Sequence, residues 1–421
     1  MSKRHLPSIA NALFLPLTLV LANDESPSCR AAAARCMSQV FSSATPRILD
    51  NVLRFVKQWL RDRDAKSSIQ CAAAQVIGVA AESCPGALAS HLRPLFLLLG
   101  NILQTTCDHA GLDDIPCNAA VRAPSAQRYG SSAILLKWDV AFHALIAVEK
   151  LLYCVPMSAQ DTTLFTSNII DLFCTGASHV ASSKYGDEGS PLARIVFMAT
   201  VRLLLYRNCR VRLAASRVVG QFLARITVET LSVRARQLPE KPLPYTGSSR
   251  GHGMLAELTV LLCEQLDETY LDTDIAKHVV KNLLYVIQAM HLAPQLFDVY
   301  HHENVQYCEG VGYFCKRRNP IGWLVSRLSD AARHNAPISC SIAFQCYGIV
   351  VSCTRNAKVL EPLVPLMMET VSKTLMTGVS DNNVHSASAR LQQRSKHLAR
   401  EIMKLLGRYV FSRKNLESVV R

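Results

Sequence analysis

The sequence contains no uninterrupted run of about 18 apolar residues, the length that a helix needs to cross a membrane. We therefore expect a soluble protein with no membrane partner, and its 49% of hydrophobic residues can form a large core. The N-terminus allows an alternative, because Lys3 and Arg4 precede an apolar stretch from Ala12 to Ala22, as in a secretory signal. A second helical segment follows at once and would lose its partner if residues 1 to 22 were removed. An ordinary first helix is therefore expected.

The motifs that frame most catalytic sites are also missing. Short glycine pairs occur at Gly251 and Gly310, but they lack the lysine and the following helix of a phosphate-binding loop. No serine sits in a nucleophile elbow. His143 lies in a helical pattern, where a partly buried ring is expected rather than a general base. We expect no enzymatic activity, no cofactor and no small-molecule substrate.

Cysteine is plentiful, with 15 residues, but the spacings of a disulfide framework are absent. Several cysteines fall in helical segments, among them Cys36, Cys71, Cys263 and Cys346. We expect these to be small buried hydrophobic residues in a reducing compartment. Zinc-type ligands gather at one place, namely His301, His302, Cys308 and Cys315. Their spacing matches no closed structural site, so no metal is expected.

Acidic residues are the minority charge. There are 46 Lys and Arg against 32 Asp and Glu, a net charge of +14. Such a balance favours polyanionic partners, either RNA or an acidic protein surface. It carries no information about the fold.

Three short segments repeat one another: CRAAAARCMS from Cys29, IQCAAAQVIG from Ile69 and VRLAASRVVG from Val211. The first two start 40 residues apart, a period typical of HEAT and armadillo helix pairs. Their shared alanines would let two helices approach to about 8 Å. The repeat predicts an all-α, HEAT/armadillo-like helical-repeat solenoid (α-α superhelix), in which each unit buries its apolar face against its neighbours.

Irregular segments interrupt the helical periodicity. Helical repeats are expected at 1–104, 132–236, 254–300 and 320–421, the last ending in a basic helix. Inserted loops are expected at 105–131, 237–253 and 301–319, where prolines, glycines or mixed charges replace the helical pattern.

Six segments follow one another in an order that resembles the C-terminal region of the small-subunit processome component 20 family, the down-regulated-in-metastasis family of U3 small nucleolar RNA-associated proteins. They include LVLANDESPSCRAAAARCMSQVF, LLLYRNCRVRLAASRVVGQFLARI and the tail LQQRSKHLAREIMKLLGRYV. The most specific pieces are Leu204–Gly220 and Lys277–Leu284. The resemblance covers about two thirds of the chain, in order, and it fails in the inserted loops.

The resemblance implies a non-enzymatic scaffold of the 90S pre-ribosome that supports 18S rRNA processing and 40S subunit biogenesis in the nucleolus. Its partners would be pre-ribosomal RNA, proteins of the U3 snoRNP, or both. Because members of that family are very long solenoids, it also implies that the chain corresponds to their C-terminal part. A helical-repeat adaptor in nuclear transport or vesicle trafficking is the alternative. Karyopherins usually present an acidic inner surface, which is opposite to this net charge.

Basic residues gather at three places that suit contact with phosphates, where each neutralised phosphate adds salt-dependent affinity. The turn before Val211 and the helix after it carry Arg207, Arg210, Arg212 and Arg217. A loop carries Lys316, Arg317 and Arg318, close to Tyr307, Tyr313 and Phe314. The terminal helix carries Arg394, Lys396, Arg400, Lys404 and Arg408 on its polar side.

Each place has an intramolecular alternative. Arg212 suits capping of its own turn or bridging of neighbouring repeats. The loop aromatics suit either stacking on unpaired RNA bases or packing against the solenoid. Cations in the terminal helix also complement its dipole.

Overall fold

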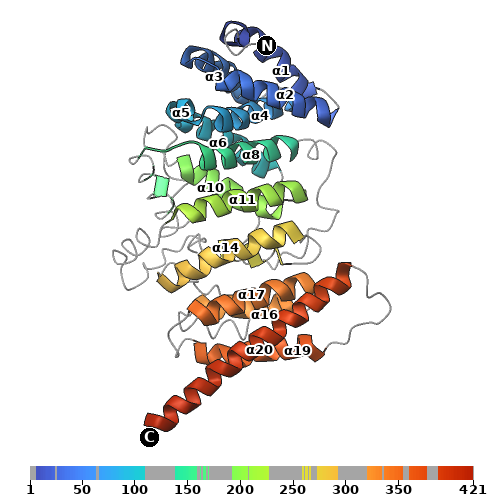
Figure 1. Cartoon of the computed structure of the whole chain (residues 1–421), viewed down its shortest axis with the longest axis vertical. Coiled ribbons are helices and arrows are strands. Elements are labelled where there is room, and N and C mark those ends of the chain that lie inside the picture. Colours follow the sequence, from blue (N-terminus) through green and yellow to red (C-terminus); the bar gives the residue numbers. More distant parts are fainter. Residues whose placement is uncertain are drawn as a thin grey trace. The chain divides into compact units, whose positions relative to one another are not determined.

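The computed structural model in Figure 1 describes residues 6–23, 26–62, 66–109, 138–158, 162, 165–166, 169, 192–206, 208–226, 258–259, 261–263, 265–266, 273–292, 320–333, 336–353, 360–376 and 387–420. All secondary structure among these residues is helical, which confirms the expected all-α class for them. The helices belong to two compact units, unit 1 from α1 to α11 and unit 2 from α14 to α20.

Proline begins several helices instead of breaking them. The first residue is proline in α2 (Pro27–Ser42), α3 (Pro46–Arg61) and α5 (Pro85–Leu88). Proline suits this position because its φ is already helical and the missing N–H would have no partner there. Ser26 also caps α2, since its hydroxyl accepts a hydrogen bond from the Cys29 N–H at 3.5 Å.

The helices of unit 1 form two rows. One row contains α2, α4 (Ser67–Ser83), α8 (Trp138–Cys154) and α11 (Cys209–Arg225), each packed on the next. The other contains α1 (Leu6–Asn23), α3, α6 (Leu92–His109) and α10 (Leu192–Arg202), again packed in sequence. Contacts between the rows pair α1 with α2, α3 with α4, α6 with α8 and α10 with α11 (Figure 1). Short 3-10 helices lie at Ala89–His91 (η1) and Leu203–Leu205 (η4).

A constant register joins α4, α8 and α11. Gln75 bonds to His143 and Arg217 to Glu149, in both cases across 68 positions of sequence. The ion pair Lys150–Glu82 has the same separation, as 150 − 82 = 68. Contacts two helical turns apart, such as those at Gln75 and Glu82, keep the same sequence separation from their partners. Neighbouring helices of this row therefore run in the same direction. Along the chain, a helix that runs in the opposite direction must therefore lie between two successive members of the row. α6 lies between α4 and α8, and α10 lies between α8 and α11.

The repeated alanines are at the centre of the packing in this row. Ala72 and Ala73 are completely buried in α4, and Ala214 and Ala215 are 2% and 0% exposed in α11. In α2, Ala33 is buried and Ala32 only half-buried. The second and third sequence copies are not neighbours, because α8 packs between them.

The stretch Pro85–Asp108 is long and apolar enough to cross a membrane by length and composition alone. In the structure its main helix, α6, packs against α3, α8 and α10. A Cβ atom on Gly100 would lie 3.0 Å from Cγ2 of Val196 in α10, so the two helices are in close contact. α6 ends at His109, beyond the end expected at residue 104. The other residues of the three expected loops lie outside the described parts of the chain.

Unit 2 consists of α14 (Thr273–Leu292), α16 (Pro320–Arg333), α17 (Pro337–Cys353), η6 (Glu361–Leu363), α19 (Val364–Met376) and α20 (Ala387–Val420). α17 packs against α14, α16 and α20, and α19 packs against α16 and α20. The Ser395 hydroxyl of α20 donates to the Pro337 carbonyl of α17 at 2.6 Å. A Cβ atom on Gly348 would lie 3.3 Å from Ile402 Cδ1, so glycine lets α17 and α20 approach closely.

We expect Ala73→Leu to destabilise unit 1 by about 1–3 kcal/mol, because the added atoms have no space between α4 and its neighbours. The exposed Ala31→Leu in α2 is the matched control and should change stability by less than about 0.5 kcal/mol. Urea unfolding followed by circular dichroism measures both. Equal midpoints for the two variants would contradict the packing role of the alanines.

Candidate nucleic-acid interface

The turn that leads into α11 is held by its own side chains. The Arg210 N–H donates to the Asn208 side-chain oxygen at 2.9 Å, which caps the start of the helix. Arg212 is only 5% exposed, and its guanidinium donates to the Tyr206 carbonyl at 2.9 Å. Arg212 thus takes the capping position that the sequence left as the alternative to phosphate contact.

The other described cations of this cluster lie beside carboxylates of α8. Two guanidinium nitrogens of Arg217 lie 2.9 and 2.8 Å from Oε1 of Glu149. Burial raises the pKa of Glu149, and the charges of Arg217 and Lys150 oppose that shift. Burial also raises the pKa of Asp139, while Arg210 opposes it. The sequence missed both acids because they lie far from the arginines along the chain.

A third polar contact in the same row joins α4 to α8. The Gln75 side-chain nitrogen lies 3.2 Å from Nε2 of His143, in hydrogen-bond contact. Burial, and then the charge of Arg30, lower the pKa of His143 to about 4. The ring is therefore neutral at neutral pH and accepts this bond. This is the partly buried helix position that the sequence predicted for His143.

The terminal helix presents its cations differently. Arg394, Arg400 and Arg408 are exposed, and so is Arg390, which is not among the predicted contact residues. Lys404 is exposed too and lies 2.9 Å from Glu401. Lys396 is half-buried. The signal for Arg390 was its position four residues before Arg394, on the same face of a helix.

Four of the predicted contact residues, Arg207, Lys316, Arg317 and Arg318, lie outside the described residues. The same holds for the loop aromatics and for the possible zinc ligands. Among the residues that the structure does describe, no group of three His, Cys, Asp or Glu side chains could hold a metal ion.

The described cysteines are free thiols. Cys71, Cys263 and Cys346 are buried as expected, but Cys36 is exposed on α2, and the prediction for it was wrong. Its neighbour Met37 faces the core instead. Burial raises the pKa of Cys71 to about 12, so this thiol is protonated and unreactive at neutral pH.

A groove of about 300 Å³ lies between α16 and α19. Its walls are formed by Ala332, Arg333, Leu366, Glu369, Thr370, Lys373 and Met376. Both cations have acidic partners on their own helices, with Arg333 2.9 Å from Asp330 and Lys373 2.5 Å from Glu369. The ion pair with Lys373 lowers the pKa of Glu369. The groove thus has balanced charges.

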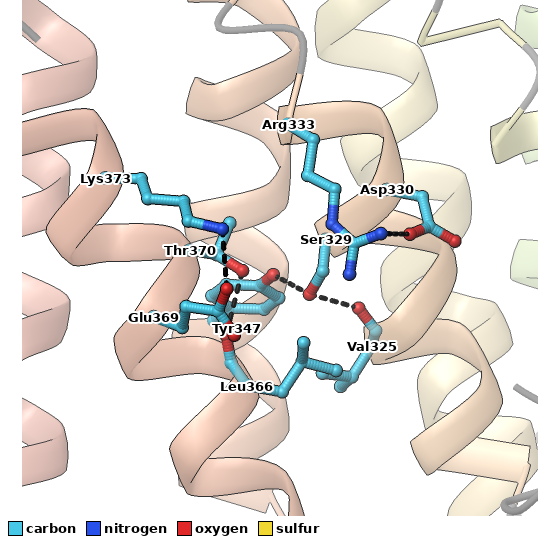
Figure 2. Close-up of polar contacts among 9 residues, drawn as sticks. All are labelled: Val325, Ser329, Asp330, Arg333, Tyr347, Leu366, Glu369, Thr370 and Lys373. Atoms are coloured by element: carbon cyan, nitrogen blue, oxygen red, sulfur yellow. Dashed lines mark hydrogen bonds and ion pairs between the residues drawn. The ribbon is translucent and has the colours of Figure 1, made fainter. Parts of the chain in front are cut away.

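Beneath the groove, Tyr347 is completely buried. Its hydroxyl lies 2.5 Å from the Ser329 hydroxyl, which donates to the Val325 carbonyl at 2.7 Å. Figure 2 shows Tyr347 lying between Ser329 and Thr370. Burial raises the pKa of Tyr347 to about 12, and hydrogen bonds with Ser329 and Thr370 oppose the shift. The tyrosine is therefore a neutral link between α16, α17 and α19.

A scan of the chain against protein-family models found no match, and a search of curated proteins also found none.

The lowered pKa of His143 predicts a loss of stability in acid. A ring that stays neutral down to pH 4 when folded, but gains a proton near pH 6.5 when unfolded, stabilises the folded state fully above pH 6.5. As the pH falls from 6.5 to 4, up to about 2–3 kcal/mol should be lost. His143→Gln should flatten this part of the urea-midpoint profile. A profile of the variant that runs parallel to that of the original chain would contradict the assignment.

Tyr347→Phe should destabilise unit 2 by about 1–2 kcal/mol, because it removes the hydrogen bonds at the centre of the α16, α17 and α19 contact. Tyr153→Phe in α8 is the matched control, since that side chain is 77% exposed. Thermal unfolding gives both values. A shift for Tyr153→Phe as large as that for Tyr347→Phe would rule out the buried network as the cause.

Proposed function

We propose that the protein is a non-enzymatic scaffold of the small-subunit processome, built as a HEAT/armadillo-like solenoid that supports 18S rRNA processing in the nucleolus. The observation that carries the proposal is the ordered resemblance to the small-subunit processome component 20 family. Three of its segments fall on helices of one row of unit 1, with CRAAAARC in α2, CAAAQVIG in α4 and VRLAASRVVG in α11.

The architecture within unit 1 supports the solenoid part of this proposal. Each helix of one row packs on the next helix of that row and on a partner in the other row. Stacks of this kind bury apolar faces between successive pairs and leave long surfaces free for other macromolecules. Such surfaces suit an assembly scaffold better than an enclosed active site.

The charge of the chain supports RNA or an RNA-bound assembly as the partner. Its net charge is +14, and the exposed cations of α20 have only one acidic neighbour, Glu401, on the helix up to residue 410. An adaptor for nuclear transport or vesicle trafficking would share the helix pairs, but nothing in its function requires this excess of positive charge.

Purification of the tagged full chain from cells tests the proposal. U3 RNA and precursors of 18S rRNA should be enriched at least about tenfold over a tagged basic helical protein of similar charge, which controls for electrostatic capture. Imaging should place the tagged chain in the nucleolus. Recovery with transport GTPases or vesicle coats, without U3 RNA, would favour the adaptor and contradict the scaffold.

A further inference from the structure

Two of the three predicted basic clusters, in α11 and in α20, contain residues that the structure describes. The two clusters differ in what surrounds their charges. In α11, Arg212 is buried against a backbone carbonyl and Arg217 is paired with Glu149. In α20, Arg390, Arg394 and Arg400 are exposed and form no hydrogen bond or ion pair with any described residue. Arg210 and Arg217 are also exposed, but Arg217 is engaged with Glu149. Among the described residues, Arg390, Arg394 and Arg400 are therefore cations that an external partner can reach without breaking an ion pair.

The geometry of α20 places these cations on one face. Ser395, Ala399, Ile402 and Leu406 are buried and mark the side that docks within unit 2. With 3.6 residues per turn, the opposite side carries the exposed cations. They are Arg390, Arg394, His397, Arg400, Lys404 and Arg408. We call this set, without His397, the α20 basic face.

We propose that the α20 basic face binds the phosphate backbone of double-stranded RNA. The choice of RNA over another polyanion rests on the proposed function, whereas the location rests on the exposure of these side chains. Arg390 and Arg408 are 18 positions apart, which corresponds to about 27 Å along a straight helix. Double-stranded DNA presents one phosphate charge about every 1.7 Å of its axis, and an RNA duplex likewise carries two phosphates per base pair, so each cation has phosphates within reach.

A duplex fits this face better than a single strand. Proteins that bind single strands stack bases on exposed aromatic side chains. Between residues 387 and 410, α20 has no Phe or Trp, its one tyrosine, Tyr409, is half-buried, and the one exposed ring is the imidazole of His397. Recognition without stacking depends on the shape and the backbone of the nucleic acid, which is how proteins bind double-stranded RNA.

On an RNA duplex this face is suited to the backbone and not to the base sequence, because side chains cannot read the deep, narrow major groove of A-form RNA. The long cationic side chains of the face project from a helix whose opposite side is held to α17 by the hydrogen bond from the Ser395 hydroxyl to the Pro337 carbonyl. Such cations contact phosphates without distinguishing bases. Affinity should therefore depend on salt and hardly on sequence.

The test measures binding of a labelled RNA duplex of about 16 base pairs to the full chain by fluorescence anisotropy over a range of salt concentrations. The variant Arg390→Gln, Arg394→Gln, Arg400→Gln, Arg408→Gln should bind about 100-fold more weakly at low salt. The slope of log K against log salt should fall by about 3–4, close to one per lost phosphate contact. Circular dichroism should show that the variant is folded, because these side chains are exposed.

A matched variant with the same loss of charge is the control: Arg35→Gln, Arg47→Gln, Arg61→Gln, Arg93→Gln, all exposed residues of unit 1. Its slope should stay within about 1 of the original value. Equal losses for the two variants would show capture by net charge alone and overturn the proposal. Unchanged binding of the α20 variant would overturn it as well.

Two competitors decide the class of partner. Polyglutamate that displaces the duplex at equal charge concentration would indicate an acidic protein partner and overturn the RNA assignment. A single-stranded RNA of the same length that binds more tightly than the duplex would overturn the duplex assignment. Duplex binding with no U3 RNA recovered from cells would instead contradict only the proposed processome function, so the two failures are distinguishable.

Discussion

The close approach of helices that small residues permit is the constraint on which the described structure depends. In unit 1, Ala72, Ala73 and Ala215 have no exposed surface, and the row that contains them keeps one register from α4 through α8 to α11. A larger residue at these places would push the helices apart and remove the side-chain contacts across them. In unit 2, Gly348 has the equivalent role where α20 packs on α17.

The same close packing decides which charges remain available. Once α8 lies beside α11, Glu149 is brought to Arg217, and the turn before α11 folds so that Arg212 is directed at its own backbone. Charged groups that become buried need such partners, because desolvation penalises an unpaired charge. α20 differs because only one of its sides is packed. The arginines on its unpacked side remain exposed to solvent. This exposed side is the surface that suits a polyanion.

Much of the fold could be predicted from the sequence. An all-helical chain was predicted from the period of 40 residues, the alanine pairs and the helical spacing of apolar residues. All secondary structure among the described residues is helical. α8, which packs between α4 and α11, could not be recognised as a member of the row from sequence, because it shares little with the alanine motif. Cys36 was placed wrongly because helical spacing alone did not show which face of α2 is buried; the buried face carries Met37, and Cys36 lies outside it.

The sequence by itself determined the helical class, the excess of positive charge and the identities of the candidate cations, because these follow from composition and local periodicity. Only the tertiary structure decided which cations are used internally. The partners Glu149 and Arg217 are 68 positions apart, and the α20 arginines differ from Arg212 by their surroundings and not by their type. Burial and ion pairing arise when distant helices pack, so no local pattern contains them.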